Sequence, residues 1–472
     1  MKKIFLLWLA LQCSVSLVQA QYHVELKRTG AGAGTVFLLR YTHNGAAVLL
    51  DSVRANSKGA ATFASKQNVL ASGMYVVAAG EQEIYFLASG KPNFKLTIEA
   101  DINNRQTPVY KNSKENEDFG RFFRLQNETA AQLQALQQHY AAYNKNQDSL
   151  WVMEQKINAL RTQQTQQNSQ IAAQNEGTLL YSMIRALQDP EVPSVEIPNN
   201  AANPDSVRWE GIVKYAKNHF FDLVDFNDNR LIYTPVLGMR LSLFFQQILR
   251  FEPAGAIIDA VNKLLAKVKN NPEMYRYVLT WLYQRYNSSP IEGHYAVGKV
   301  LTDYMADSTV VNWLTAGEEQ ELQKNLKRYA LNPVGSIAAD LVLRTPSGEL
   351  KSLHCVEAPY TVLYFYNPGC HTCKETTPLV HNILQYYKDK GLKVFAVYPD
   401  REKAEWETYI SENHYGDFIN VWDADELAGI YEKYSLYAIP QIYVLDEHKK
   451  ILHKDVSVED LQSILFFLLG RN

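Results

Sequence analysis

The sequence predicts a multidomain protein with an N-terminal antiparallel β-sandwich, a central all-α region and a C-terminal α/β domain. Three patterns along the 472 residues support this division. Short runs that alternate apolar and polar side chains fill residues 22–105, and apolar residues recur at helical spacing through residues 115–332. After residue 335, strand-like and helix-like segments alternate. A chain of this length holds about two to four domains, so three regions are reasonable folding units.

The first twenty residues predict a signal peptide. A lysine pair precedes the apolar residues 4–11, a stretch too short to cross a bilayer, and Val18-Gln19-Ala20 has the small residues of a cleavage site. The alternative is an uncleaved anchor. We expect cleavage before Gln21 and a protein that resides in the periplasm or cell envelope.

The overall charge excludes one class of partner. The chain has 47 Lys and Arg against 50 Asp and Glu, a formal net charge of −3. Because nucleic-acid binding needs a basic excess, we expect no nucleic-acid partner.

Residues 21–105 are expected to form the β-sandwich-like domain. The segments 23–27, 35–41 and 74–79 alternate apolar and polar side chains, and Gly-bearing breaks such as residues 30–34 separate them. The region has no catalytic constellation in its sequence.

Residues 106–333 are expected to form a helical domain, a hairpin followed by a second helical block. Apolar stripes at three- and four-residue steps begin near Phe119 and again near Ile257. The glutamine-rich residues 161–174 fit either a solvated helix or a loose loop. Residues 225–229, Asp-Phe-Asn-Asp-Asn, lack the glycine and the terminal glutamate of an EF-hand, so we expect an ordinary loop there.

Residues 334–472 are expected to form the α/β domain. Strands are predicted at residues 361–366, 392–398 and 441–445, with helical segments between them. Strands separated by helices indicate a mixed sheet with helices on both faces.

Cys370 and Cys373 form a C-x-x-C pair between the first of these strands and a helix. Cysteines three apart at a helix start have Cα atoms close enough for a disulfide. The first sulfur then lies at the helix N-terminus, where free N–H groups favour a thiolate. This arrangement predicts Cys370 as the nucleophile and Cys373 as the resolving thiol.

Two other interpretations of the pair are half of a zinc site and a structural disulfide. Zinc would need two more Cys or His ligands at suitable spacing, and the sequence has no second C-x-x-C. A disulfide across so short a loop restrains the unfolded chain little. After removal of the signal peptide one further cysteine is left, Cys355, which we expect to be a buried apolar thiol, with a third redox cysteine as the alternative.

This segment order resembles the thioredoxin fold over roughly residues 336–470. The matching features are the C-x-x-C pair, the helix proline Pro378 and Ile439-Pro440 at the start of a late strand. The resemblance implies a cis Ile439–Pro440 bond that faces the dithiol and a backbone that pairs with the incoming peptide. A strand hairpin that precedes these features is similar to the TlpA/ResA branch of exported thioredoxin-like proteins.

The upstream regions also resemble known domains. Residues 22–105, with Asp51-Ser52 and the turn at Gly59, resemble an uncharacterised β domain fused to envelope thioredoxin-like modules. Residues 218–222 through Thr234-Pro235 resemble a helical domain of unknown function. Neither resemblance implies a reaction.

The sequence departs from the thioredoxin pattern around the dithiol. Gly369 stands where thioredoxin-type sites commonly have Trp, and Tyr364 stands where thioredoxin has a buried aspartate. Thr376 replaces a glutamate common in the TlpA/ResA branch, and Glu375 is one position early. The proton acceptor for Cys373 therefore stays open between Tyr364, Glu375 and water.

His371, next to Cys370, has two alternative roles. As an imidazolium close to the sulfur it would stabilise the thiolate and tune the dithiol, and it would then help to position substrate. Otherwise it points to solvent.

These features predict an extracytoplasmic thiol–disulfide oxidoreductase that reduces protein disulfides. The Cys370–Cys373 disulfide would be its only redox group, with no metal and no organic cofactor. Its partners would be disulfide-containing exported proteins and an electron donor, which could be membrane-bound. The alternatives are a disulfide oxidase or isomerase that uses the same residues, and a non-catalytic envelope scaffold with a degenerate thioredoxin module.

Overall fold

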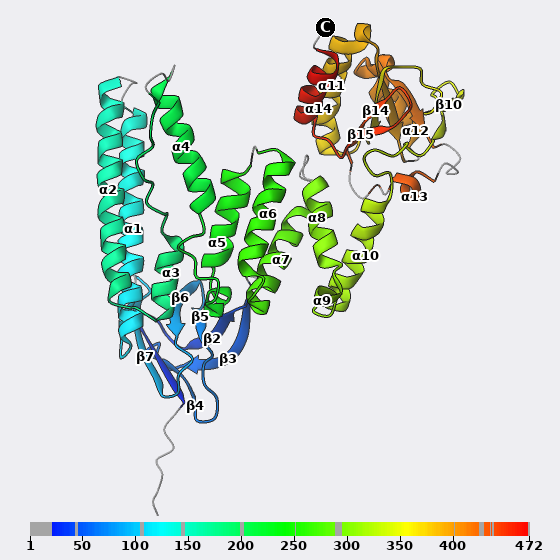
Figure 1. The fold of residues 1–472 in the computed structure, drawn as a ribbon. Coiled ribbons are helices and arrows are strands. Elements are labelled where there is room, and N and C mark those ends of the chain that lie inside the picture. The colour runs from blue at the N-terminus through cyan, green and yellow to red at the C-terminus, as the bar shows by residue number, and fades with distance from the viewer. Residues whose placement is uncertain are drawn as a thin grey trace, which may run out of the picture. The chain divides into compact units, whose positions relative to one another are not determined.

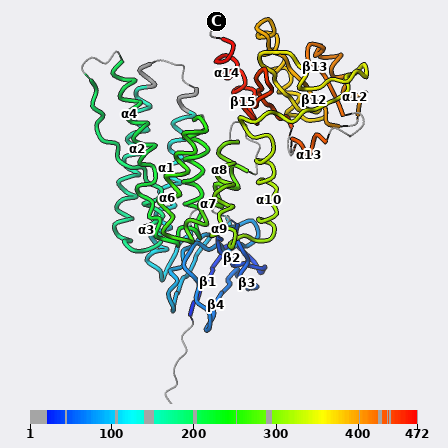
Figure 2. The backbone as a smooth tube through the Cα atoms, turned by 45° about the vertical axis from the view of Figure 1, so that its right-hand side comes forward, coloured from blue at the N-terminus to red at the C-terminus, as the bar shows by residue number. Residues whose placement is uncertain are grey.

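The computed structural model describes residues 21–42, 46–103, 108–142, 147–198, 203–250, 252–287, 295–400, 402–423, 429–434, 436 and 439–470. The predicted signal peptide, residues 1–20, lies outside these ranges. The chain divides into two compact units at residues 250 and 251. The first unit holds the β domain and the earlier helices, and the second holds the later helices and the α/β domain (Figure 1, Figure 2).

Two four-stranded sheets form the β domain, in the orders β4-β1-β7-β8 and β3-β2-β5-β6. The strands are β1 (Tyr22–Thr29), β2 (Gly34–Tyr41), β3 (Ala47–Ala55), β4 (Ala61–Ser65), β5 (Gly73–Ala79), β6 (Gln82–Ala88), β7 (Phe94–Asp101) and β8 (Val109–Lys111). Neighbouring strands are antiparallel except β1 and β7, which pair in parallel. The predicted β-sheet fold class is confirmed, with this parallel pair as a difference.

Alternation along the strands builds the core of this domain. In β1, Val24 and Leu26 are fully buried while His23 and Lys27 are exposed. Successive side chains of a strand point to opposite faces, so one row faces the interior and the other faces water. The two sheets are also joined by a hydrogen bond from the Tyr110 hydroxyl to the Tyr85 carbonyl.

A helical hairpin follows, as the sequence predicts. Helices α1 (Lys114–Ala142) and α2 (Gln147–Ala173) lie side by side (Figure 1). The glutamine-rich stretch belongs to α2 up to Ala173, which decides for the helix over the loop. Side-chain amides of this stretch form hydrogen bonds across the hairpin. Gln164 of α2 donates to Gln126 of α1, and Gln126 donates to Asn168 of α2.

The remaining elements of the first unit are short. They are α3 (Leu179–Leu187), α4 (Pro204–His219), the 3-10 helix η1 (Asn229–Tyr233), α5 (Val236–Ser242) and the π-helix η2 (Leu243–Ile248). Leu179, Leu180, Met183 and Ile184 of α3 are almost completely buried.

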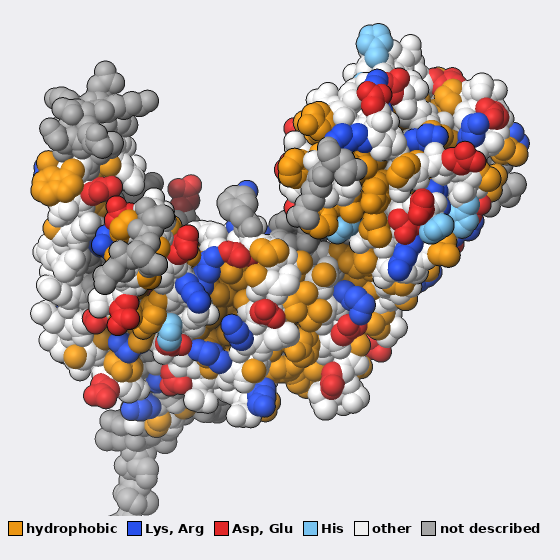
Figure 3. Space-filling view, turned by 45° about the horizontal axis from the view of Figure 1, so that its top comes forward, with side chains coloured by type: hydrophobic (Ala, Val, Ile, Leu, Met, Phe, Trp, Pro, Cys, Tyr) orange, Lys and Arg blue, Asp and Glu red, His pale blue; other side chains and the backbone are white. Residues whose placement is uncertain are grey.

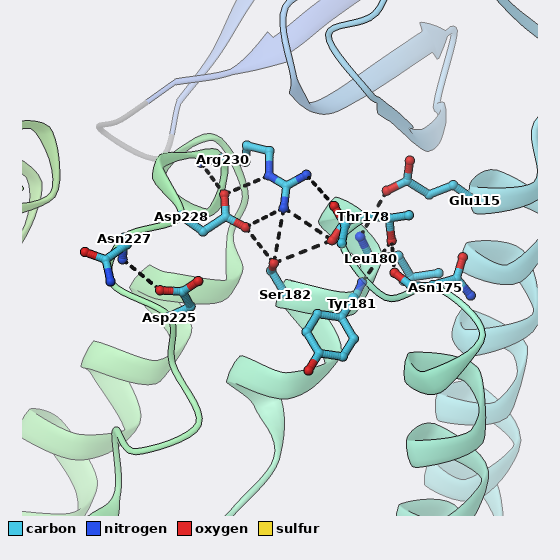
Figure 4. Close-up of polar contacts among 11 residues, drawn as sticks. Glu115, Asn175, Thr178, Leu180, Tyr181, Ser182, Asp225, Asn227, Asp228 and Arg230 are labelled. Atoms are coloured by element: carbon cyan, nitrogen blue, oxygen red, sulfur yellow. Dashed lines mark hydrogen bonds and ion pairs between the residues drawn. The ribbon is translucent and has the colours of Figure 1, made fainter.

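The acidic segment at residues 225–229 is a helix cap, as expected for an ordinary loop. Asp228 accepts hydrogen bonds from the backbone and guanidinium of Arg230 and from the Ser182 hydroxyl (Figure 4). Asp225 accepts from the backbone N–H of Asn227. Both oxygens of Asp228 are thus occupied by protein donors.

The second unit begins with helices α6 (Ala254–Val268), α7 (Pro272–Asn287), α8 (Tyr295–Met305), α9 (Ser308–Val311) and α10 (Ala316–Ala330). The stripe predicted near Ile257 is the buried face of α6, where Ile257, Val261, Leu264, Leu265 and Val268 have at most 2% of their surface exposed. Helix α10 starts with a capping box between Thr315 and Glu318.

A seven-stranded mixed sheet forms the centre of the α/β domain, in the order β10-β9-β13-β12-β11-β14-β15. Its strands are β9 (Val342–Arg344), β10 (Leu350–Ser352), β11 (Tyr360–Phe365), β12 (Leu392–Tyr398), β13 (Ile419–Trp422), β14 (Gln441–Asp446) and β15 (Ile451–Lys454). Strands β11, β12 and β13 are parallel, and β14 is antiparallel to β11.

Helices cover both faces of this sheet, as predicted. Helices α11 (His371–Tyr387), α12 (Lys403–Glu412) and α14 (Val458–Leu469) pack on the face that bears Val362 and Tyr364. Helix α13 (Ile430–Tyr434) packs on the opposite face, which bears Leu363 and Phe365. Strand β11 is therefore buried on both sides.

The Asp228 cap gives a test of the first unit. Burial alone would raise the pKa of Asp228, but hydrogen bonds from Arg230 and Ser182 outweigh it and lower the pKa. A lowered folded-state pKa stabilises the fold above the unfolded value of about 3.9, and this stabilisation is lost as the pH falls through the folded value. Asp228→Asn should therefore lower the free energy of unfolding by about 1–3 kcal/mol at pH 7 and by much less at pH 3.

Chemical denaturation at the two pH values measures this difference. Asp205→Asn is the matched control, because the Asp205 side chain is 89% exposed beside Arg208 and such pairs contribute little. An equal loss of stability at pH 7 and pH 3 would contradict the ionic role of Asp228.

Candidate active site

The dithiol lies where a buried strand ends and a helix begins. After β11 the chain turns through residues 366–369, and α11 starts at His371 with Cys370 as its N-cap residue. The Asn367 side chain accepts the Gly369 N–H at 2.6 Å, and the Cys370 N–H bonds to the Asn367 carbonyl at 3.0 Å. These two bonds fix the turn that presents Cys370.

The two thiols differ in exposure. Cys370 is partly exposed, whereas Cys373 has only 1% of its surface accessible and belongs to the core beneath it. Both are free thiols, and they share a hydrogen bond. The sulfur of Cys370 is therefore the more accessible of the two, and the nucleophilic and resolving roles stay a prediction.

The Ile439–Pro440 segment faces the outer sulfur. Its peptide bond is cis, as the resemblance implies, and the Cys370 thiol lies 3.6 Å from the Ile439 carbonyl oxygen. Pro440 immediately precedes β14, the strand next to β11. Segments far apart in sequence, residues 370 and 439, thus meet at one end of the sheet.

Burial makes Cys373 a weak acid. It raises the pKa of Cys373 to about 12, against an opposing contribution from the Asn367 backbone N–H, and the neighbouring Cys370 raises the pKa further. At neutral pH this thiol is protonated and must lose its proton before it attacks a mixed disulfide.

Tyr364 lies beneath the dithiol but holds its proton. It is completely buried, and its hydroxyl is 2.9 Å from the Thr377 hydroxyl, which in turn donates to the Cys373 carbonyl. Burial raises the pKa of Tyr364 well above its ordinary value, although the Thr377 hydrogen bond opposes this shift. The Tyr364 hydroxyl forms a hydrogen bond with Thr377, but because the phenol is neutral it does not take up the thiol proton.

Glu375 and His371 lie on the solvent side of α11. Their side chains are 69% and 88% exposed, and the two are 3.9 Å apart. His371 thus takes the solvent-facing alternative. The Glu375 carboxylate therefore lies in solvent, whereas Cys373 is buried.

The structure adds residues that the sequence reasoning missed. Asp400 accepts a hydrogen bond from the Asn367 amide, and the Tyr431 hydroxyl donates to Asp400 at 3.4 Å. These contacts attach the turn before Cys370 to the segment that follows β12 and to helix α13. The position of Asn367 within the Asn-Pro-Gly-Cys segment was the only signal in the sequence.

A second missed group connects the site to helix α10. Gln441, the residue after Pro440, donates to one carboxylate oxygen of Asp455, and Arg328 of α10 pairs with the other at 3.3 Å. The Lys454 ammonium donates to the Arg328 and Leu331 carbonyls at the end of α10. Strand β14, which follows the cis proline, is therefore anchored through Asp455 to helix α10.

Cys355 corrects a prediction. The sequence suggested a buried apolar thiol, but Cys355 is exposed. The turn after β10 buries its neighbours Leu353 and Val356 instead, and this turns the cysteine side chain outward.

Candidate metal ligands are scattered in the described part of the chain. There, no group of three or more His, Cys, Asp or Glu side chains is placed to hold a metal ion. The zinc interpretation of the C-x-x-C pair would need such a group.

Two family models match separate parts of the chain. A thioredoxin-like family model matches residues 359–451, and a domain of unknown function, DUF5106, matches residues 156–326. The C-terminal domain belongs to the thioredoxin-like family. Proteins similar to this domain include thiol-disulfide oxidoreductases from Bacteroides, and the family resemblance seen in the sequence is confirmed.

Individual relatives cover the C-terminal region. The thioredoxin-like protein YneN of Bacillus subtilis is 28% identical over 118 residues, which are 24% of this chain and 65% of YneN, so the chain spans less than two thirds of that curated relative. A domain of a possible thiol-disulfide isomerase from Cytophaga hutchinsonii is 30% identical, with 29% of this chain and 92% of that domain covered and a TM-score of 0.28. The thioredoxin domain of a thiol-disulfide oxidoreductase from Bacteroides vulgatus is 26% identical, with 29% and 97% covered and a TM-score of 0.28.

The high pKa of Cys373 predicts a steep pH dependence. With a pKa of about 12, the thiolate fraction of Cys373 rises about tenfold per pH unit between pH 7 and pH 10. The release of a small aromatic thiol from a mixed disulfide preformed on Cys370 should accelerate by the same factor. Stopped-flow absorbance measures this rate, and a plateau below pH 9 would contradict the role of burial.

Lys454 predicts a pH dependence of stability. Burial lowers its pKa to about 8, with Asp455 opposing and Arg328 adding to the shift. In the unfolded chain Lys titrates near 10.4, so the unfolded state binds more protons between pH 8 and pH 10.4 and stability rises with pH in that window. The integrated contribution is about 3 kcal/mol at most.

Lys454→Met isolates this contribution. The free energy of unfolding of the variant, relative to the wild type, should fall between pH 7 and pH 10, because only the wild type gains stability from deprotonation of Lys454. A constant difference between the two proteins would overturn the assignment. Lys299→Met is the control, because Lys299 is 46% exposed beside Asp303.

Proposed function

We propose that this protein is an extracytoplasmic thiol–disulfide oxidoreductase that reduces protein disulfides through Cys370 and Cys373. The observation that carries the proposal is the different exposure of two neighbouring thiols. Cys370 is partly exposed and lies 3.6 Å from the Ile439 carbonyl oxygen, whereas Cys373 is buried and hydrogen-bonded to Cys370. One sulfur can be reached from outside, and the other can act only after the first has reacted.

The reaction balances over two exchanges. The Cys370 thiolate attacks one sulfur of a substrate disulfide, a mixed disulfide forms, and the other substrate sulfur leaves as a thiolate that takes up a proton. Cys373 then loses its proton, attacks the sulfur of Cys370 and releases the second substrate thiol. Two electrons pass from the dithiol to the substrate, and Cys370 and Cys373 end as a disulfide.

The protein's groups have distinct parts in these steps. Cys370 is the N-cap residue of α11, which places its sulfur beside the free N–H groups of the helix start. The backbone at Ile439 and Pro440 lies at the right place to pair with an extended substrate segment beside the sulfur. Water reaching the edge of the dithiol, with Glu375 behind it, is the acceptor for the Cys373 proton, because Tyr364 stays neutral.

Reduction is favoured over oxidation by the position of His371. A strongly stabilised thiolate makes a disulfide oxidising, as in DsbA. The His371 side chain is 88% exposed and faces Glu375, so it adds little to the stability of the thiolate. A reduction potential near that of thioredoxin, about −270 mV, supports the reductase, and a value near −120 mV would support an oxidase instead.

Location and partners follow from the amino-terminal sequence and the chemistry. A cleaved signal peptide would deliver the protein to the periplasm or envelope, and among the described helices none is long and apolar enough to cross a membrane. The substrates would be exported proteins with disulfides, and an electron donor, which could be membrane-bound, would have to re-reduce the dithiol. Acidic and basic side chains are mixed over the face in Figure 3, unlike the basic surface of a nucleic-acid-binding protein.

Three cysteine variants test the proposal. The wild type should accelerate the reduction of insulin disulfides by dithiothreitol, and Cys370→Ser should abolish the acceleration. Cys373→Ala should accumulate mixed disulfides on Cys370 in the native host, because the resolving thiol is missing. Cys355→Ser is the control and should behave like the wild type.

The outcome also separates this function from the scaffold alternative. Equal activity of the wild type and Cys370→Ser, with no trapped partner in Cys373→Ala, would overturn the oxidoreductase. A non-catalytic envelope scaffold would then be the better account.

A further inference from the structure

A cavity of about 1080 Å³ opens at one end of the β domain, away from the dithiol in sequence and in a different unit. Its wall comes from the end of β1, the glycine-rich residues 30–34, the turn between β5 and β6, and the first part of α1. The space beside Gly32 and Gly34 is open, because an added Cβ at either position would meet no atom within 4 Å. The loop thus borders the cavity without side chains that close it.

Arg28 lies in this wall, at a position of β1 whose side chain faces the core. It continues the inward row of Tyr22, Val24 and Leu26 along β1 and has only 8% of its surface exposed. An arginine at such a position is unusual, because a buried charge is costly unless it is paired.

The charge of Arg28 has no carboxylate partner among the described residues. Its Nη1 donates to the Ala79 carbonyl at 3.2 Å, and its Nε has no hydrogen-bond partner there. Desolvation by burial lowers the pKa of Arg28, and no neighbouring carboxylate opposes this shift. The side-chain amide oxygen of Gln82, a residue of the same cavity wall, is also buried without a partner among the described residues.

The acidic residues around the cavity make other contacts. Glu83 accepts the Tyr85 hydroxyl at 2.6 Å, and Asp101 accepts the Asn103 N–H at 2.9 Å. Glu81 is exposed at the turn between β5 and β6. With these three carboxylates at the cavity, a ligand that carries several negative charges would be repelled.

The rest of the wall mixes polar groups with apolar and aromatic side chains. Ile84 and Phe119 are buried, while Phe37 and Ile102 are 40% and 42% exposed. An apolar ligand body would cover the two exposed side chains and remove their surface from water.

We propose that this cavity binds a ligand with a single carboxylate and an apolar body, with the carboxylate on the guanidinium of Arg28. A guanidinium can donate charge-assisted hydrogen bonds to a carboxylate, and among the described residues only Nη1 of Arg28 has a protein partner, the Ala79 carbonyl. A small amphipathic acid and the free C-terminus of a peptide share this chemistry.

Calorimetric titration of the full-length protein with matched probes tests the site. Octanoate represents the small acid, and N-acetyl-leucyl-phenylalanine represents the peptide C-terminus; octanamide and the peptide amide are their uncharged counterparts. At least one acid should bind and its amide should not, and the acid that binds identifies the source of the carboxylate. Absence of binding by both acids at millimolar concentration, or equal binding of acid and amide, would overturn the proposal.

Arg28→Met is the decisive variant, with Arg54→Met, an exposed arginine on β3, as its control. Arg28→Met should weaken acid binding by about tenfold or more, because it removes the charge-assisted bonds, while Arg54→Met should not change it. The melting temperature of Arg28→Met should stay at or above that of the wild type, because an unpaired buried charge is removed. A large fall in melting temperature together with unchanged binding would show that Arg28 has only a structural role.

Discussion

Strand β11 is buried on both faces at the centre of the seven-stranded sheet, and the geometry of the dithiol depends on that burial. Because β12 and β14 hold its two edges and helices cover both faces, its C-terminal end is fixed in place. The Asn367 turn then sets Cys370 at the start of α11, and the first turn of that helix carries Cys373 into the core. The same strand pairing brings the beginning of β14, and with it Pro440, beside the outer sulfur.

Burial gives the two sulfurs their separate roles and also creates the main chemical difficulty of the site. A buried Cys373 is protected from outside reagents, but it has to be deprotonated in a core that lacks a carboxylate at the position of Tyr364. The hydroxyl pair of Tyr364 and Thr377 satisfies the polar groups beneath the dithiol without serving as a base. On the proposed function, the Cys373 proton would therefore leave through the solvent edge of the site.

The sequence predicted what local pattern and short motifs can encode. The fold class followed from periodicity, Cys370 and Cys373 followed from the C-x-x-C motif, and Pro378 and Ile439-Pro440 followed from the resemblance to the thioredoxin fold. The Asp455–Arg328 contact joins residues 127 positions apart and has no local signal, so it could not be predicted. Cys355 was misjudged because an apolar neighbourhood in sequence does not say which residue of a turn faces water. Arg28 was missed because the predicted strand segment ended at residue 27, and only the structure shows that no carboxylate of the described residues pairs with it.

The difference in accessibility between the two sulfurs is the central claim, and alkylation of the reduced, folded full-length protein measures it directly. With a brief exposure to iodoacetamide at pH 7 and site-resolved mass spectrometry, Cys370 should be modified at least about tenfold faster than Cys373, because one sulfur lies at the helix N-terminus and the other is a buried, protonated thiol. Equal rates, or faster modification of Cys373, would contradict the assignment of Cys370 as the nucleophile.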